Sequence, residues 1–497
     1  MTAVTRGEKP FDTSRSNLRL FIVGAMLLVA LALRLYGLNS GLWYDEILTS
    51  INYARMPFGE IIATYDSQNQ HFLFSLLSRA STLIFGESAW ALRLPAVVFG
   101  VASIWALYLL GREVGSETEA LLSAALLTFS YHHVWFSQNA RGYTGLLFWA
   151  ILSSWYFLRG LREGRSRLWV LYAGAAALGI YTHMTMIFVI IGQFIVYLTA
   201  LVNRRHAAPQ SGWRGLFLGF GFAGLFTLLL LAPALPQILY GGSLGEVSTV
   251  SAWKHPLWTL LEIIRGIEIG FAGGVFAVGA LAVFGAGMWD FARTKPALIG
   301  LFFIPVILCA AVVIALGHHL WPRFFFFAFG FGVLIAVRGA TVLGRWLAKI
   351  VGMPAQAALL GIVAGVGLVF VSALSVPFAY GPKQDYAGAL AFVQQERQPG
   401  DAVVTVGLAT FPYQRLYQVD WTGVESLEAL NDIRLRAKRT WLLYTFPPEL
   451  ESVYPDIVAS IRRDFQVVKE FPGTVGEGAI IVCRSDVPPG QVEASSQ

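Results

Sequence analysis

About eleven stretches of apolar residues, each long enough to cross a bilayer, recur between residues 19 and 379, and they constrain the fold more than any other feature. A helix rises about 1.5 Å per residue, so roughly 20 apolar residues cover the ~30 Å hydrocarbon core of a membrane. Charged residues make up only 13% of the chain, whereas a soluble domain carries about 25%. The sequence therefore excludes a soluble globular protein and predicts an α-helical polytopic membrane protein.

The predicted spans leave one apolar segment ambiguous. They cover residues 19–37, 90–110, 118–134, 143–159, 168–182, 184–202, 214–239, 270–290, 297–316, 323–338 and 356–379. The segment 71–85, HFLFSLLSRASTLIF, is apolar but short, and Ser75, Ser78 and Arg79 interrupt it. We predict that it forms an interfacial helix, because one more crossing would move the Arg-rich loop 159–167 to the outside.

Basic residues indicate the orientation of the chain. With the N-terminus in the cytoplasm, the inner segments carry about twice as many Lys and Arg residues as the outer loops of the membrane region, in line with the positive-inside rule. The first apolar stretch has no cleavage site, so we expect it to stay as a span. We predict a multi-pass protein of the cytoplasmic (inner) membrane with a cytoplasmic N-terminus. The net charge of +6 then reflects topology, and no nucleic-acid partner is expected.

The composition changes after residue 379. Residues 380–497 hold 11 of the 36 basic and 15 of the 30 acidic residues, which is a soluble balance. Short apolar runs such as DAVVTVG and GAIIVC alternate there with helix-like stretches, the pattern of a small α/β domain. We expect a transmembrane domain over 1–379, an extracytoplasmic α/β domain over 380–485 and a disordered tail over 486–497. Cys309 and Cys483 fall in different parts, so no disulfide is expected between them.

The first outer loop, which begins GLWYDEILTSINYARMPFGEII, is rich in carboxylates. Its acidic residues include Asp45, Glu46, Glu60 and Asp66. Trp43 and Tyr44 suit the aromatic belt at the headgroup level, which places the two carboxylates that follow them just above the bilayer. Such carboxylates are candidates for acid–base chemistry, and the alternative is that they are ordinary charges of a solvated loop.

Three further outer segments carry cations. Arg141 lies in SYHHVWFSQNARGYTGLL, Arg323 lies in GHHLWPRFFFFAFG, and Lys254 and Arg265 lie in WKHPLWTLLEIIRGIEIG. The guanidinium fork matches the geometry of a phosphate, although a lone arginine at a span end also snorkels to the interface. Arg265 recurs with two glutamates on one helical face, where a structural network is the other interpretation.

No motif supports a metal or nucleotide site. The pairs His132–His133 and His318–His319 are adjacent, and neighbours on a helix diverge by about 100°, so neither pair alone makes a chelating face. The sequence contains no HExxH, CxxC or GxxxxGK[ST] pattern. We therefore assign no metal ligand and no cofactor, with a divalent metal as an alternative that no motif supports, and we expect no use of cytoplasmic ATP.

Four segments together resemble the GT-C superfamily of polytopic membrane glycosyltransferases. They are RLYGLNSGLWYDE, the block from NQHFLF to GESAWALRLP, WFSQNARGYTGLLF and WPRFFFFAFG. The likeness covers roughly residues 18–340 and is strongest to the bacterial branch that resembles protein O-mannosyltransferases and lipid A aminoarabinose transferases. It implies the inverting transfer of one sugar from a polyprenyl-phosphate donor to a lipid, polysaccharide or protein acceptor outside the cytoplasmic membrane.

The resemblance, together with the chemistry of the transfer that it implies, gives roles to the candidate residues. Asp45 carries over as the catalytic base, with Glu46 beside it. The donor phosphate would be held by Arg141, Arg323, Arg265 and Lys254. Sugar or acceptor contacts would come from Asp66, Glu60, His71, Tyr143, Gln138 and Asn139. Related sequences have proline after the histidine of NQHFLF, whereas this chain has Phe72, so the resemblance does not fix the role of His71.

Other functions are compatible with the same spans. A ligase or polymerase that moves a whole lipid-linked glycan would use a similar fold. A transporter of lipid-linked sugars should place ionisable residues near the bilayer midplane, whereas the middles of these spans are almost free of charge. A structural or anchoring protein is a further alternative if the carboxylates of the first outer loop are inert.

Overall fold

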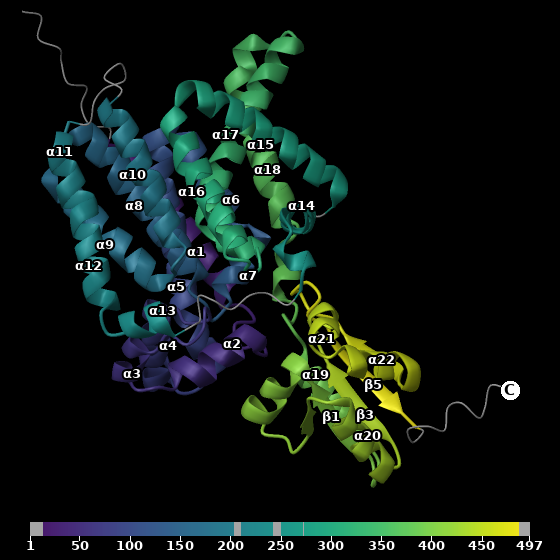
Figure 1. Cartoon of the computed structure of the whole chain (residues 1–497). Coiled ribbons are helices and arrows are strands. Elements are labelled where there is room, and N and C mark those ends of the chain that lie inside the picture. Colours follow the sequence, from purple (N-terminus) through teal and green to yellow (C-terminus); the bar gives the residue numbers. More distant parts are fainter. Residues whose placement is uncertain (1–12, 203–209, 242–249, 272, 487–497) are drawn as a thin grey trace, which may run out of the picture.

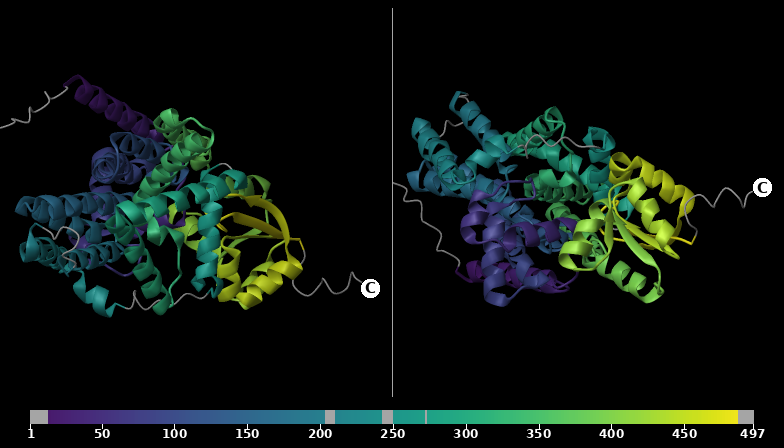
Figure 2. Two further views of the ribbon diagram at one scale, coloured as in Figure 1. Left: turned by 90° about the horizontal axis from the view of Figure 1, so that it is seen from above. Right: turned by 60° about the horizontal axis from the view of Figure 1, so that its bottom comes forward.

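The chain folds into a helical bundle and a small sheet domain. The computed structural model describes residues 13–202, 210–241, 250–271 and 273–486. Figure 1 shows the sheet domain, in yellow and green, next to the end of the bundle that carries α2 (Tyr44–Thr49), α3 (Phe58–Ala63) and α4 (Phe72–Phe85), and Figure 2 shows the same neighbours from two other sides. The tail predicted over 486–497 lies, apart from Asp486, outside the described residues.

Helices of ten residues or more build the bundle. They are α1 (Thr13–Leu35), α5 (Ala89–Val114), α6 (Glu117–Thr128), α8 (Tyr143–Glu163), α9 (Ser166–Thr182), α10 (Met186–Val202), α12 (Phe222–Leu231), α14 (Pro256–Gly270), α15 (Gly274–Thr294), α16 (Pro296–Ala315), α17 (Phe329–Ile350) and α18 (Ala357–Ala373), together with α4. The shorter segments are α7 (Tyr131–Ser137), α11 (Gly212–Gly215), α13 (Leu235–Tyr240), η1 (Ser50–Ala54), η2 (Leu216–Gly221), η3 (Ala252–Lys254), η4 (Pro322–Ala328), η5 (Pro354–Gln356) and η6 (Val376–Tyr380).

A helix lies at each of the predicted spans. Within the described ranges, 7 helical segments are long and apolar enough to cross a membrane: Asn17–Leu35, Ala89–Val114, Gly212–Leu231, Gly274–Thr294, Pro296–Ala315, Pro322–Ile350 and Pro354–Tyr380. Helices α6, α8, α9 and α10 occupy the remaining predicted spans. The α-helical polytopic architecture is therefore confirmed.

Two predicted spans are interrupted. Helix α6 ends at Thr128, and Ser130 begins α7 because its hydroxyl caps the new helix by accepting a hydrogen bond from the N–H of His133. The helix predicted over 214–239 ends at Leu231, just before Pro233, which has no N–H to continue the ladder. The predicted interfacial segment is α4, whose 14 residues span only about 21 Å and so fall short of the ~30 Å core.

Glycines set the closest helix contacts in the bundle. A Cβ placed on Gly339 of α17 would lie 1.8 Å from the carbonyl oxygen of Val283 in α15, and one on Gly287 of α15 would lie 1.9 Å from that of Ile335 in α17. The two backbones therefore touch directly, which is how helices associate in lipid, where apolar side chains gain little from contact with one another.

The sheet domain has five strands in the order β2-β1-β3-β5-β4. The strands are β1 (Ala402–Val406), β2 (Thr422–Val424), β3 (Thr440–Tyr444), β4 (Gln466–Phe471) and β5 (Ile480–Ser485). Strand β1 pairs in parallel with β2 and β3, and β5 pairs antiparallel with β3 and β4. The covering segments are α19 (Tyr386–Glu396), η7 (Gly407–Ala409), η8 (Pro412–Leu416), α20 (Leu427–Arg436), α21 (Pro447–Val453) and α22 (Pro455–Asp464). The small α/β domain expected near the C-terminus is thus confirmed, and both cysteines are free and buried.

The connection between bundle and sheet domain is tightly packed. The ammonium group of Lys383 is buried, donates a hydrogen bond to the carbonyl oxygen of Gln138 at 2.7 Å and lies 5.3 Å from the ring of Trp135. Ile47 of α2 packs in the same apolar cluster as Tyr386 and Trp441 of the sheet domain. The sheet domain therefore supports the short helix that follows the first span.

Candidate active site

Two arginines from distant parts of the chain approach Asp45. Asp45 lies in the first turn of α2, Arg141 precedes α8, and Arg323 lies in η4. The Oδ2 atom of Asp45 is 3.9 Å from Nη2 of Arg141 and 3.6 Å from Nη2 of Arg323. Both distances exceed those of a hydrogen bond, so the three groups attract one another without being joined.

Polar atoms without hydrogen-bond partners gather at this place. In the described part of the chain they include Oδ2 of Asp45, Nε and Nη1 of Arg141, Nε of Arg323 and Nε2 of His71, all buried. Buried polar groups are normally satisfied, so a cluster of unsatisfied ones indicates a ligand or reacting group. Two guanidinium groups with free N–H donors suit an anion that has several oxygens, such as a phosphate.

Aromatic rings hold the two arginines. The guanidinium of Arg323 lies 4.7 Å from the ring centre of Trp321 and 5.9 Å from that of Trp43. The guanidinium of Arg141 lies 5.7 Å from the ring centre of Tyr143. These cation–π contacts fix the cations without occupying their N–H donors.

His71 directly precedes α4, and its ring centre lies 5.6 Å from that of Tyr143. Its Nδ1 accepts a hydrogen bond from the N–H of Gly142 at 2.9 Å, so the ring proton belongs on Nε2. Burial, together with the nearby charges of Arg141 and Arg323, holds the pKa of His71 well below its usual value. A neutral His71 with a free Nε2–H donor results. Gly142 permits this contact, since a Cβ there would lie 2.8 Å from the carbonyl oxygen of Thr182.

A second histidine, His183, lies beside His71. Their ring centres are 4.6 Å apart, and the ring centre of Tyr143 is 5.2 Å from that of His183. Burial lowers the pKa of His183 to about 3, with Arg141 and Arg323 adding to the effect. The sequence reasoning missed His183, because a histidine in the short turn between two apolar helices carries no motif.

The remaining acidic candidates of the loop differ in position. Asp66 accepts a hydrogen bond from the hydroxyl of Tyr53 at 2.7 Å. Burial and this bond raise the pKa of Tyr53, and the charge of Arg141 opposes the rise. Glu60 is exposed on α3 and makes no ion pair within the described ranges. Asp66 is therefore held by Tyr53 of the same loop, and Glu60 lies at the surface.

Glu46 is held in a structural ion pair. Its side chain is fully buried, and its two oxygens accept bonds from Nε and Nη2 of Arg93 at 2.7 and 2.6 Å. They also accept bonds from the N–H groups of Ala140 at 2.6 Å and Trp43 at 3.3 Å. Burial disfavours the charge, but Arg93 and Lys383 outweigh it and lower the pKa of Glu46. The carboxylate is ionised, and its four hydrogen bonds leave neither oxygen free to serve as a base.

Gln138 and Asn139 have structural partners as well. The amide of Gln138 donates to the carbonyl oxygens of Arg34 and Tyr36 at 3.1 and 2.6 Å. Asn139 accepts a bond from the indole N–H of Trp43 at 3.1 Å, which leaves its Nδ2 without a partner. These two residues fix the loop that carries Arg141. Asn139 also fixes the indole ring of Trp43, which lies 5.9 Å from the guanidinium of Arg323.

Lys254 and Arg265 are not part of the cluster formed by Asp45, Arg141 and Arg323. Arg265 bonds to Glu262 at 2.6 Å one turn away, and its side chain is 65% exposed. Lys254 ends η3 and forms no ion pair in the part of the chain that is described. The predicted structural network of Arg265 is thus present in part. Among the described residues, no group of three His, Cys, Asp or Glu side chains is placed to hold a metal ion.

The comparisons with known proteins point to one group of membrane enzymes. Residues 69–236 match the family described as dolichyl-phosphate-mannose-protein mannosyltransferase. The undecaprenyl phosphate-α-4-amino-4-deoxy-L-arabinose arabinosyl transferase of Pseudomonas aeruginosa is 27% identical over 237 residues, which are 45% of this chain and 40% of that protein. Across the curated relatives that match, the chain covers between 17% and 40% of their length.

Solved structures share the fold over most of this chain. ArnT from Cupriavidus metallidurans in the apo state aligns with a TM-score of 0.53 at 13% identity, over 95% of this chain and 98% of that one. The archaeal oligosaccharyltransferase AglB from Archaeoglobus fulgidus, in complex with an inhibitory peptide and a dolichol-phosphate, aligns with a TM-score of 0.55 at 11% identity, over 96% and 75%. At such identities the likeness establishes the fold alone.

Proposed function

Because the chain has the fold of the GT-C superfamily of membrane glycosyltransferases, we propose that it transfers a single sugar from a polyprenyl-phosphate donor to an acceptor hydroxyl. The observation that carries the proposal is the approach of Arg141 and Arg323 to Asp45, with free hydrogen-bonding atoms on all three. The matched family is named for a dolichyl-phosphate donor, and ArnT has been solved with undecaprenyl phosphate bound. Both names support a lipid phosphate as the ligand of the arginines.

The proposed reaction uses Asp45 as the base. The acceptor O–H gives its proton to the carboxylate while its oxygen attacks the anomeric carbon. The bond between that carbon and the phosphate oxygen breaks on the opposite face, so configuration inverts and the electron pair leaves with the lipid phosphate. Arg141 and Arg323 stabilise the charge that grows on the phosphate. The neutral Nε2–H of His71 donates to a sugar or phosphate oxygen.

The location of the site fits a lipid donor. Asp45 follows Trp43 and Tyr44, which suit the headgroup region, and α4 is short enough to lie along the interface. We place this end of the bundle and the sheet domain outside the cytoplasmic membrane, with the N-terminus in the cytoplasm. The acceptor then belongs to the cell envelope and is a lipid, a polysaccharide or a protein.

A test of the function compares two carboxylate variants in the first outer loop. Full-length protein in nanodiscs is supplied with undecaprenyl-phosphate-linked mannose, glucose or aminoarabinose and an envelope extract as acceptor, and released undecaprenyl phosphate is measured. Asp45→Asn should lower the rate about 10²- to 10⁴-fold, the usual contribution of a general base. Glu87→Gln, which changes an exposed carboxylate paired with Arg55, should leave the rate unchanged. An Asp45→Asn variant with wild-type rate would exclude Asp45 as the base.

A further inference from the structure

The sheet domain contains a cavity that the proposed reaction does not use. Its volume is about 230 Å³, and Gly407, Leu408, Thr445, Glu449, Leu450, Val453 and Tyr454 line it. Gly407 and Leu408 directly follow β1, and Thr445 directly follows β3. The cavity thus opens at the carboxyl ends of two neighbouring parallel strands, which is where open α/β sheets bind ligands.

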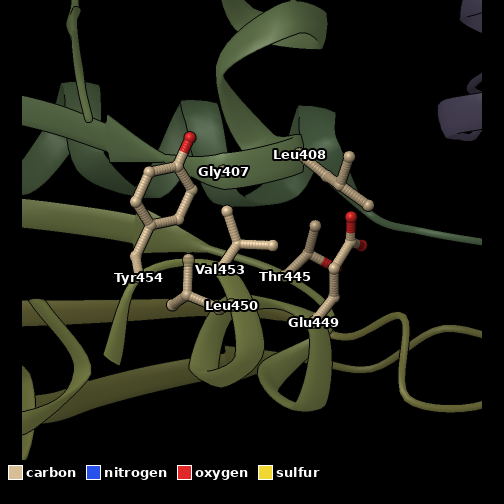
Figure 3. A pocket seen from close by; sticks show the side chains of 7 residues that line it. All are labelled: Gly407, Leu408, Thr445, Glu449, Leu450, Val453 and Tyr454. Carbon is tan, nitrogen blue, oxygen red and sulfur yellow. The ribbon is translucent and has the colours of Figure 1, made fainter. Parts of the chain in front are cut away.

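The cavity combines one free carboxyl group with apolar walls. Figure 3 shows Tyr454 and Leu408 on opposite sides, with Val453 between them and the carboxyl group of Glu449 on the side of Leu408. Within the described residues, the side chain of Glu449 forms no ion pair, and burial raises its pKa to about 7. Glu449 is only partly buried, so a ligand that enters the cavity can reach its carboxyl group.

The wall of the cavity is hydrogen-bonded to the loop that carries Asp45. The hydroxyl of Thr445 accepts a bond from the amide of Gln384 at 3.1 Å. The carbonyl oxygen of that same amide accepts a bond from the backbone N–H of Tyr44 at 3.0 Å. One side chain, Gln384, therefore bridges the cavity and the residue before Asp45.

The rim of the cavity also meets the bundle near the arginine site. Leu408 and Phe446 pack with Trp253 and Trp321 in one apolar cluster. Trp321 is the ring on which Arg323 rests. The cavity therefore lies beside the apolar cluster that includes Trp321.

We propose that this cavity binds one sugar ring of a saccharide acceptor for the transfer at Asp45. The proposal rests on the proposed function and adds the class of acceptor. The cavity is smaller than the roughly 300–1,000 Å³ typical of drug-sized ligands and suits a single ring. The carboxyl of Glu449 accepts hydrogen bonds from hydroxyl groups, while Tyr454, Leu450 and Val453 cover the apolar face of the ring.

A binding experiment without the polyprenyl-phosphate sugar donor tests this proposal independently of the transfer reaction. Full-length protein in detergent is mixed with methyl α-mannopyranoside, methyl β-glucopyranoside or N-acetylglucosamine, and saturation-transfer NMR reports contact. Asp45→Asn should keep the signal of the wild type even where transfer is abolished. Val453→Trp, which fills the cavity from a side chain that is 43% exposed, should remove the signal. Glu449→Gln, which keeps the volume, should weaken binding about tenfold, as expected for one lost bond to a charged group.

Three results would overturn the proposal. One is the absence of any signal from these glycosides with the wild-type protein, and another is an unchanged signal in both cavity variants. The third is binding of an unglycosylated Ser/Thr peptide to the cavity in place of the glycosides. A failure of transfer by the wild type, measured separately as release of undecaprenyl phosphate, would instead contradict the proposed function.

Discussion

Replacing Glu46 by Gln tests whether this carboxylate supports the fold or takes part in the reaction. The variant keeps the shape of the side chain but removes the charge opposite Arg93, whose guanidinium is fully buried. Glu46 accepts four hydrogen bonds, two of them from Arg93. Removing one partner of a buried ion pair costs about 3–5 kcal/mol, because the other charge is left uncompensated.

The loss should be visible as a lower melting temperature. At an unfolding entropy of about 2.1 cal/mol/K per residue, a chain of 497 residues unfolds with roughly 1 kcal/mol/K, so Glu46→Gln should lower the Tm by about 3–5 °C. Thermal denaturation of the protein in detergent measures this shift. The matched control is Glu87→Gln, since Glu87 pairs with Arg55 at 3.0 Å on the surface, where such a pair contributes about 0–1 kcal/mol.

The ion pair between Glu46 and Arg93 also predicts that the stability of the protein falls at low pH. The folded-state pKa of Glu46 lies below the ordinary value of 4.5, so its stabilisation is present above that pH and is lost as the pH falls through the folded-state pKa. Glu46→Gln should lack this part of the acid destabilisation. A Glu46→Gln protein with wild-type Tm but no transfer would refute the structural role and make Glu46 the base.

Three further predictions follow from the site and the packing. Arg141→Ala should raise the KM for the lipid-phosphate donor about 10- to 100-fold by removing a charged hydrogen-bond donor, whereas Arg265→Ala should not, since Arg265 is exposed and bonded to Glu262. Burial lowers the pKa of Lys383 to about 7 from 10.5, so the folded state binds fewer protons than the unfolded state between those values. The wild type should gain stability relative to Lys383→Met as the pH rises from about 7 towards 10, and equal slopes in pH-dependent melting would contradict this. Gly339→Ala should lower the free energy of unfolding by about 1–3 kcal/mol, seen as a lower Tm, while Gly285→Ala in the facing helix should be tolerated, because nothing lies within 4 Å of its added Cβ.

Hydrophobic segmentation predicted the bundle because a membrane demands long apolar helices. It did not predict the break between α6 and α7, which depends on a local cap by Ser130 and not on hydropathy. The sheet domain was predictable as a class from its alternating composition. The strand order of this domain was not predictable. Strand β5 pairs with β3, which is distant in the sequence, and no local sequence pattern encodes such a pairing.

The candidate residues of the first outer loop show what a sequence can and cannot separate. Asp45 and Glu46 are adjacent and acidic, and the resemblance left open which one acts. The partner that favours Asp45 over Glu46 as the proposed base is Arg93, which lies 47 positions beyond Glu46 and looks like an ordinary outer charge in the sequence. Lys383 was likewise hidden, because it stands at the start of a soluble segment where lysine is common.

The adjacency of the two carboxylates is itself part of how the site works. Neighbours on a helix point about 100° apart, so α2 directs Glu46 into the core and Asp45 towards the arginines. Four hydrogen bonds on Glu46 fix the short helix and therefore fix Asp45, whose own Oδ2 is left without a partner. At 3.6 and 3.9 Å the arginines lie beyond hydrogen-bond distance, so this oxygen keeps a free acceptor position for the proton that the proposed base would take.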